Sequence, residues 1–115
     1  MIRGDIRLVN LDPVIGAEAN KRRPAVLVSN DGANVTAVRL GKGVVIVVPV
    51  TSNVARVYPF QVMLPAKATG LRTDCKAQAE QVRSVAVQRV GPLVGRVPAD
   101  VMERIDEALR LHLAL

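Results

Sequence analysis

The chain has 115 residues, enough for one domain with a sizeable core, and its 50% hydrophobic content excludes a disordered chain. Residues 98–115 hold four acids and two arginines, a net charge of −2, so residues 1–97 hold 14 basic and 6 acidic residues, a net charge of +8 that indicates a polyanionic or acidic partner. Tyr58 and Phe60 are the only aromatic residues, which excludes a nucleic-acid reader that grips each base between aromatic rings.

The first 97 residues are expected to be mainly β, because they hold most of the 21 valines and valine favours pleated strands. Apolar segments predict strands over 4–9, 24–29 (with Pro24 at the first position), 44–50, 58–64 and 90–97, and one or two strands within 74–87. The segments between them predict a loop over 12–22, a turn over 30–32, a short helix or irregular segment over 33–40, a hinge over 41–43 and a loop over 67–72. Residues 44–50 have no polar face, so they are expected to form the central strand.

The period of the pattern changes near the C-terminus and predicts a helix over 98–113. Apolar residues recur there at helical spacing, at Val101, Met102, Ile105, Ala108, Leu109 and Leu113. Pro98 suits the first helical position, and Asp100 places a carboxylate near the positive end of the helix. The expected fold is a single mainly β domain over 1–115, a small barrel or strongly curved sheet with an amphipathic helix packed on it.

Three polar clusters interrupt the apolar strands, and each admits a structural and a functional interpretation. They are Glu18 with Lys21, Arg22 and Arg23; Thr51 with Ser52 and Asn53; and a third run of Asp74, Lys76, Gln78, Glu80, Gln81, Arg83 and Ser84. The first is either a solvated loop or a phosphate clamp, in which Pro24 and the strand hold the Arg23 fork. The second is either a strand-ending turn or a set of hydroxyl donors to a phosphate. The third is either a half-exposed strand pair or a reader of base edges in single-stranded RNA.

Familiar catalytic sets and export signals are missing from the sequence. The one histidine, His112, lies on the apolar face of the last helix and is expected to be a packing or interface residue. No two-histidine ribonuclease site, no Ser/His/Asp triad and no phosphate-binding loop can be built, and the acids show no metal-ligand spacing. No metal or cofactor is therefore expected. The single Cys75, the short apolar runs and the polar start of the chain lead us to expect a cytoplasmic protein that contacts no membrane.

Four sequence blocks resemble the MazF/PemK (Kid) family of bacterial toxins. They are Arg3-Gly4-Asp5-Ile6 with Leu11-Asp12-Pro13, Gly16-x-Glu18 and Arg23-Pro24-x-x-x-Val28-Ser29-Asn30; Val48-Pro49-Val50-Thr51-Ser52; Asp74 through Glu80-Gln81-Val82-Arg83-Ser84; and Ile105-Asp106-Glu107-Ala108-Leu109. The blocks keep the family's order and spacing across nearly the whole chain. The resemblance implies a dimeric SH3-like barrel of about seven strands. It also implies a metal-independent endoribonuclease that cuts single-stranded RNA at short sequences to give a 2′,3′-cyclic phosphate and a 5′-hydroxyl.

The resemblance further implies the roles of individual residues and a protein partner. Arg23 and Thr51 match the catalytic pair, and Glu18 lies in the gating loop. We expect the RNA-binding residues to be Lys21, Arg22, Ser52, Asn53, Gln78, Gln81 and Arg83. The cognate antitoxin would lay an acidic, partly disordered C-terminal segment over the same groove.

The expected reaction defines what the site must do, and three other functions compete with this interpretation. Arg23 is expected mainly to stabilise phosphorane charge, because arginine side chains in proteins keep their proton, and proton transfer through water or Glu18 stays open. Rival interpretations are a CcdB-like gyrase poison of the same barrel type, a plain RNA-binding barrel, and a structural dimer with a basic surface.

Overall fold

The computed structural model describes residues 1–11 and 22–115. Its strands are β1 (Asp5–Asn10), β2 (Arg22–Leu27), β3 (Val44–Thr51), β4 (Gln61–Leu64), β5 (Cys75–Gln78), β6 (Arg83–Ala86) and β7 (Val90–Arg96). Its helices are α1 (Asp31–Leu40), α2 (Ala66–Thr69) and α3 (Ala99–Leu113), and its short 3-10 turns are η1 (Ala79–Gln81) and η2 (Val87–Arg89). In this part of the chain, no helix is long and apolar enough to cross a membrane.

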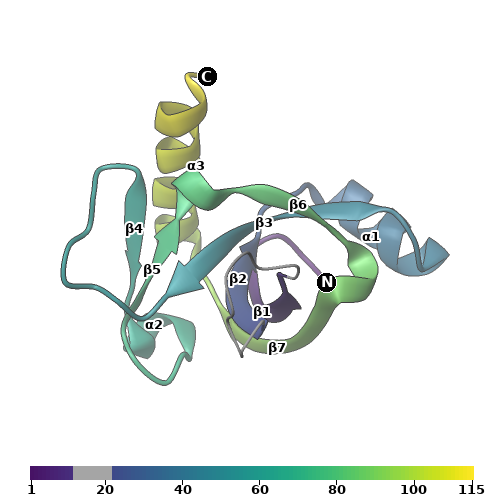
Figure 1. Ribbon diagram of the computed structural model, residues 1–115, viewed down its shortest axis with the longest axis horizontal. Helices are drawn as coiled ribbons and strands as arrows, with labels where there is room; N and C mark the ends of the chain where they lie inside the picture. The colour runs from purple at the N-terminus through teal and green to yellow at the C-terminus, as the bar shows by residue number, and fades with distance from the viewer. Residues whose placement is uncertain (12–21) are drawn as a thin grey trace.

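The strands form one antiparallel sheet that curls on itself. Their order is β4-β5-β3-β2-β1-β7, and β6 pairs with β3 beside this path. Figure 1 shows β6, β3, β2, β1 and β7 curving around a common axis, with η2 joining β6 to β7. The structure confirms the predicted mainly β fold of about seven strands with a C-terminal helix.

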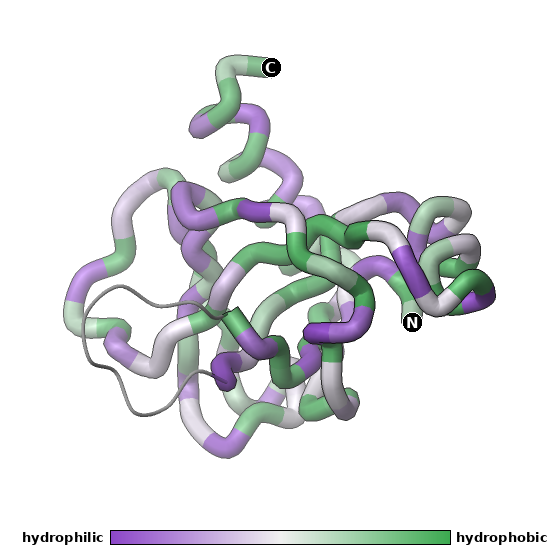
Figure 2. The backbone as a smooth tube through the Cα atoms, turned by 45° about the vertical axis from the view of Figure 1, so that its right-hand side comes forward, coloured by the Kyte–Doolittle hydropathy of each residue, from purple (hydrophilic) through white to green (hydrophobic). Residues whose placement is uncertain are grey.

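The central strand β3 is buried on both faces over most of its length, which explains why its sequence is apolar up to Thr51 at its end. Val45 and Val47 belong to the core cluster inside the curl of the sheet, whereas Val48 and Val50 belong to the cluster that α3 covers. Successive strand residues point to opposite faces, so one unbroken apolar run serves both clusters. In Figure 2, hydrophobic stretches run along the strands, whereas hydrophobic and hydrophilic residues alternate along α3.

The segment between β2 and β3 is a helix, which settles the alternative that the sequence left open. Asn30 caps α1 by accepting a hydrogen bond from the Ala33 N–H at 2.8 Å, and Gly41 ends the helix in the left-handed conformation at φ 65°. Asn34 is 0% exposed, and its amide donates to the Ser29 carbonyl at 2.9 Å. The Ser29 hydroxyl in turn accepts from the Ile46 N–H at 3.1 Å, so this polar pair fixes α1 against β3.

Helix α3 packs one face on the β4 end of the sheet. Its buried residues are Val101, Met102, Ile105 and Ala108, which belong to the predicted apolar face, whereas Leu113, predicted on the same face, is 49% exposed. Pro98 is the N-cap residue, so the helix begins one residue later than the sequence predicts. The fixed φ of proline suits either position. The last turn extends beyond the sheet in Figure 1, and there Leu111 is 60% exposed.

Two predicted strand starts were wrong. β2 begins at Arg22, two residues before Pro24. A proline is tolerated inside this strand because its pairing with β3 starts only at Ala25, so no backbone donor is needed there at position 24. β4 begins at Gln61 rather than Tyr58, because the Gln61 N–H donates to the Tyr58 carbonyl at 2.8 Å and closes a turn before the strand.

The predicted loop over 67–72 contains the short helix α2, a further correction. The carboxylate of Asp74 accepts a hydrogen bond from the Ala66 N–H at 2.8 Å, and Gly70 ends the helix at φ 82°. Residues 74–87 hold two strands, with η1 between them. Gln81 therefore lies on a 3-10 turn and not on a strand.

Candidate functional site

A cleft of about 910 Å³ lies at the C-terminal end of β3. Residues of β1, β2, β3, β7 and the connection from α2 to β5 form its walls. Its lining residues are Leu8, Arg22, Arg23, Pro24, Val50, Thr51, Ser52, Gly70, Leu71, Arg72, Thr73, Cys75 and Val94.

Arg23 reaches the cleft from β2, where it is paired with Val9 of β1. The pairing of β2 with β3 begins at Ala25, opposite Pro49, and Arg23 and Thr51 lie just beyond this pairing, where both line the cleft. The Arg23 side chain is exposed, and within the described residues no carboxylate forms an ion pair with it. A guanidinium in this setting keeps its fork of donors for a ligand.

Thr51 ends β3 and is held by the turn that follows. Its hydroxyl oxygen accepts a hydrogen bond from the Asn53 N–H at 3.2 Å, and the Asn53 side-chain oxygen accepts from the Ala55 N–H at 3.3 Å. This is the strand-ending turn that the sequence allows. Since the Thr51 oxygen is the acceptor there, its hydroxyl hydrogen can be donated into the cleft.

The charged residues in the described lining of the cleft are all positive. Its lining includes Arg22, Arg23 and Arg72 and, among the residues that the structure describes, no Asp or Glu. The side chains of Thr51 and Thr73 also line the cleft and can offer hydroxyl donors. Such a lining favours phosphate or carboxylate groups.

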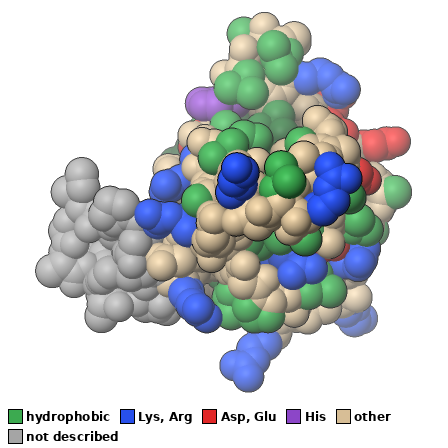
Figure 3. Space-filling model, turned by 90° about the vertical axis from the view of Figure 1, so that its right-hand side faces the viewer, with side chains coloured by type: hydrophobic (Ala, Val, Ile, Leu, Met, Phe, Trp, Pro, Cys, Tyr) green, Lys and Arg blue, Asp and Glu red, His purple; other side chains and the backbone are tan. Residues whose placement is uncertain are grey.

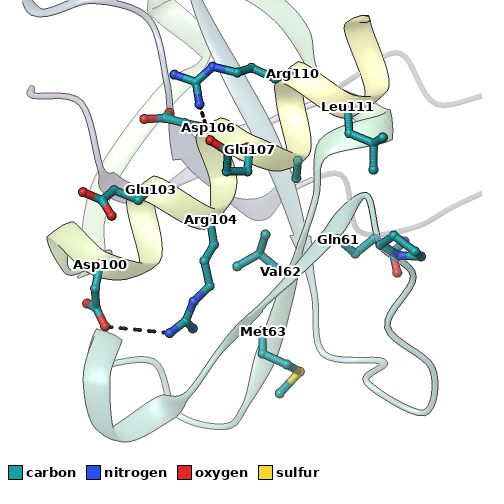
Figure 4. A pocket seen from close by; sticks show the side chains of 12 residues that line it. Gln61, Val62, Met63, Asp100, Glu103, Arg104, Asp106, Glu107, Arg110 and Leu111 are labelled. Carbon is teal, nitrogen blue, oxygen red and sulfur yellow. Dashed lines mark hydrogen bonds and ion pairs between the residues drawn. The ribbon is translucent and has the colours of Figure 1, made fainter. Parts of the chain in front are cut away.

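A second hollow, of about 1220 Å³, has the opposite character. It lies between β4 and α3, and Figure 4 shows the acidic helix residues Asp100, Glu103, Asp106 and Glu107 around it. Arg104 and Arg110 are engaged there in ion pairs with helix acids, at 4.0 Å and 2.6 Å. In Figure 3, Lys and Arg side chains are spread over the visible face, whereas Asp and Glu gather at one edge beside α3. The cleft at β3 is thus the better site for a polyanion.

Cys75 lines the cleft but is suited to packing. It is 6% exposed, and burial raises the pKa of its thiol, to which the nearby Asp74 carboxylate adds. Its thiol also donates weakly to the Thr73 carbonyl at 3.4 Å. The thiol therefore stays protonated near neutral pH and is a poor nucleophile.

The structure brings together four of the ten predicted site residues, Arg22, Arg23, Thr51 and Ser52. Asn53 follows directly and shapes the turn below Thr51. Glu18 and Lys21 lie outside the described residues.

The remaining three predicted RNA-binding residues do not line the cleft. Gln78 lies at the other end of β5 from Cys75, Gln81 is exposed on η1, and the Arg83 guanidinium donates to the Leu11 carbonyl at 3.4 Å. Their contacts with RNA stay a prediction. The exposed His112 ring lies 6.2 Å from the ring of Phe60, near the C-terminal end of α3.

Sequence reasoning missed Arg72 and Thr73. Both lie on the connection between α2 and β5, which the sequence presents as an ordinary polar loop. The available signal was an arginine two residues before the third polar cluster, at the entrance to a predicted strand.

The curled antiparallel sheet, its C-terminal helix and the cleft at the end of β3, whose described lining carries arginines and no carboxylate, define a small β-barrel protein equipped to hold an anion. Over residues 2–113 the chain matches the profile of the PemK-like, MazF-like toxins of type II toxin-antitoxin systems, and it belongs to this family. This confirms the family resemblance of the sequence blocks.

Individual relatives agree with this assignment. Endoribonuclease MazF9 of Mycobacterium tuberculosis (strain ATCC 25618 / H37Rv) is 63% identical over 115 residues, which cover 100% of this chain and 98% of the relative. Endoribonuclease EndoA of Bacillus subtilis (strain 168) is 32% identical over 114 residues, 98% of this chain and 94% of the relative. A crystal structure of MazF from Deinococcus radiodurans is similar with a TM-score of 0.76 and 30% identity, over 100% of this chain and 97% of that one. A MazE-MazF structure from the same organism has a TM-score of 0.73 and 27% identity, over 100% and 96% of the two chains.

Proposed function

We propose that this toxin is a sequence-specific, metal-independent endoribonuclease of single-stranded RNA. The endoribonuclease names of MazF9 and EndoA support this reaction class. The observation that carries the chemistry is that Arg23, near the start of β2, and Thr51, at the end of β3, line one cleft whose described lining holds no carboxylate. The guanidinium groups of Arg22, Arg23 and Arg72 in this lining attract a phosphodiester.

In the proposed reaction the ribose 2′-oxygen attacks the adjacent phosphorus. A bond forms between the 2′-oxygen and phosphorus, and the bond from phosphorus to the 5′-oxygen of the next nucleotide breaks. The products are a 2′,3′-cyclic phosphate and a 5′-hydroxyl. The 2′-hydroxyl loses its proton, and the departing 5′-oxygen gains one.

Arg23 stabilises the charge that builds on the non-bridging oxygens during this attack. Its fork can donate to two of these oxygens at once, and the Thr51 hydroxyl can donate to one of them. Arginine is a weak proton donor because its pKa is above about 12. We therefore assign the proton transfers to water or to Glu18, and Arg23 and Thr51 to charge stabilisation.

The experiment is digestion of a mixed RNA by the purified toxin in the presence of EDTA, followed by mapping of the new 5′ ends. We expect 5′-hydroxyl ends at one short sequence. Absence of cleavage with retained RNA binding would favour the plain RNA-binding barrel. Absence of both, together with inhibition of gyrase, would favour the CcdB-like poison.

We further propose that the toxin acts in the cytoplasm as a homodimer inhibited by a cognate antitoxin. Exposed apolar residues at the end of α3, Leu111 at 60% and Leu113 at 49%, support a contact with a second copy. The basic cleft supports binding of an acidic antitoxin segment in competition with RNA, and a relative has been solved as a MazE-MazF complex. Light scattering checks the dimer, and antitoxin affinity that does not fall as salt rises would contradict the electrostatic account.

A further inference from the structure

We propose that Arg72 binds a second RNA phosphate, next to the one that is cut, and so positions the substrate from the rim of the cleft opposite Arg23. This inference rests on the proposed function and assigns a binding subsite to the same cleft. β2 and β5 flank β3 on its two sides, so Arg23 enters from one side and the segment leading into β5 enters from the other. The Arg72 side chain is exposed and lines the cleft, and no carboxylate of the described residues forms an ion pair with it.

The rim that carries Arg72 is anchored on its N-terminal side by Thr69. Thr69 is 4% exposed, and its hydroxyl donates to the Pro65 carbonyl at 2.9 Å while accepting from the Leu71 N–H at 3.3 Å. Gly95 of β7 permits this close packing, because a Cβ there would lie 2.6 Å from the Thr69 carbonyl oxygen. The backbone just before Arg72 is thus fixed against the sheet.

The C-terminal side of the same rim is also fixed. Asp74 holds the start of α2 through the Ala66 N–H, and Cys75 is a buried core residue at the start of β5. Only the Arg72 side chain must lose freedom when an anion binds, since its backbone is already ordered. A preorganised guanidinium of this kind keeps more of its interaction energy as affinity.

The ligand that this geometry favours is a phosphate of the bound RNA chain. RNA carries a phosphate at every nucleotide, so a strand whose scissile phosphate lies on Arg23 must bring neighbouring phosphates along the cleft. Arg72 and the adjacent Thr73 hydroxyl provide charged and neutral donors for one of them. A backbone contact of this kind positions the strand without reading its sequence.

The test measures the affinity for an RNA oligonucleotide that contains the mapped site with a 2′-deoxy nucleotide at the cut, so that binding proceeds without cleavage. We compare wild type with Arg72→Gln, Arg72→Lys and Arg39→Gln, which removes one exposed arginine from the last turn of α1. We expect Arg72→Gln to weaken binding about tenfold. The slope of log affinity against log salt should also decrease by about 0.7, the value for one contact to a single-stranded phosphate. Arg72→Lys should keep this slope, and Arg39→Gln should resemble wild type.

A second arm locates the phosphate by replacing one linkage at a time with a neutral methylphosphonate. At one linkage beside the cut, wild type and Arg72→Gln should become equal in affinity. On cleavable RNA, Arg72→Gln should raise KM and leave kcat near the wild-type value. Equal affinity and equal salt slope for Arg72→Gln and Arg39→Gln would overturn the inference even if wild type cleaves RNA. An affinity difference between wild type and Arg72→Gln that no single methylphosphonate removes would overturn it as well. Loss of kcat alone would also contradict a positioning role, and failure of wild type to cleave would count against the proposed function instead.

Discussion

The ammonium group of Lys76 donates a hydrogen bond to the backbone carbonyl of Arg56 at 2.5 Å, and it does so from a side chain that is only 7% exposed. Lys76 lies opposite Thr51 in the pairing of β3 with β5. Arg56 belongs to the connection that leaves the cleft after Ser52, and its guanidinium lies 5.6 Å from the centre of the Tyr58 ring. The buried lysine thus anchors the segment that carries both aromatic residues of the chain, whose rings stack at 5.4 Å.

Replacing Lys76 with methionine should destabilise the protein. Methionine fills similar space but leaves the Arg56 carbonyl without its donor, a loss of about 1–3 kcal/mol. Urea denaturation measures the free energy of unfolding, and Lys67→Met, at an exposed position of α2, is the matched control that should change it by less than about 0.5 kcal/mol. Equal stability of the two variants would show that the Lys76 contact contributes nothing.

Two substitutions of Arg23 separate the effect of its charge on kcat from the effect of its planar geometry. Arg23→Gln should lower kcat by about 10²–10³, the cost of removing one preorganised donor to the transition state. Arg23→Lys keeps the charge but loses the planar fork, so its kcat should lie between that of wild type and that of Arg23→Gln. Single-turnover cleavage of one defined RNA measures this, and thermal unfolding should be unchanged because the side chain is exposed. Near-wild-type turnover of Arg23→Lys would contradict a bidentate contact.

The sequence predicts those parts of the fold in which the local pattern of apolar residues determines which side chains are buried. The apolar run of β3 and the helical spacing of Val101 and Ile105 each determine one arrangement, and the structure has both. The start of β4 and the helix α2 were missed because hydrogen bonds that apolar patterning does not reveal determine them. The Gln61 N–H donates to the Tyr58 carbonyl, and the Ala66 N–H donates to the Asp74 carboxylate.

The same distinction applies to the site. Arg23 and Thr51 stand at strand ends that apolar patterning locates, and the family blocks drew attention to them. Arg72 was missed because nothing local marks it. Its place in the cleft follows from the packing of Thr69 against Gly95, which only the folded chain brings together.

Gly95→Ala tests this packing. The added Cβ would lie 2.6 Å from the Thr69 carbonyl oxygen, so the rim before Arg72 must move or β7 must shift. We expect a loss of about 1–3 kcal/mol in unfolding free energy, as for other overpacked sites. The control is Gly32→Ala in α1, where the nearest atom is the Asn30 side-chain oxygen at 3.3 Å, so only a small movement of that side chain is needed and the loss should be smaller than for Gly95→Ala. RNA affinity of Gly95→Ala should fall as well, because Arg72 is displaced, and unchanged affinity would separate the rim from binding.

The raised pKa of Cys75 makes both the stability of the protein and the alkylation rate of this thiol depend on pH. Burial and the Asp74 carboxylate disfavour the thiolate in the folded state, so the folded thiol keeps its proton at a pH where the unfolded thiol has lost it. The unfolded state then binds fewer protons, and this residue's contribution to stability is lost as pH rises through the ordinary thiol range. Iodoacetamide should therefore modify the folded protein much more slowly than the urea-unfolded protein near neutral pH.

Asp74→Asn separates the two causes, because the amide oxygen can still accept from the Ala66 N–H while the charge is removed. Its alkylation rate should rise at a lower pH than that of wild type but at a higher pH than that of the unfolded chain, since burial is the larger cause. Mass spectrometry of the modified peptide over a pH series measures both profiles. Coincident profiles for folded and unfolded protein would contradict the raised pKa, and coincident profiles for wild type and Asp74→Asn would leave burial as its whole cause.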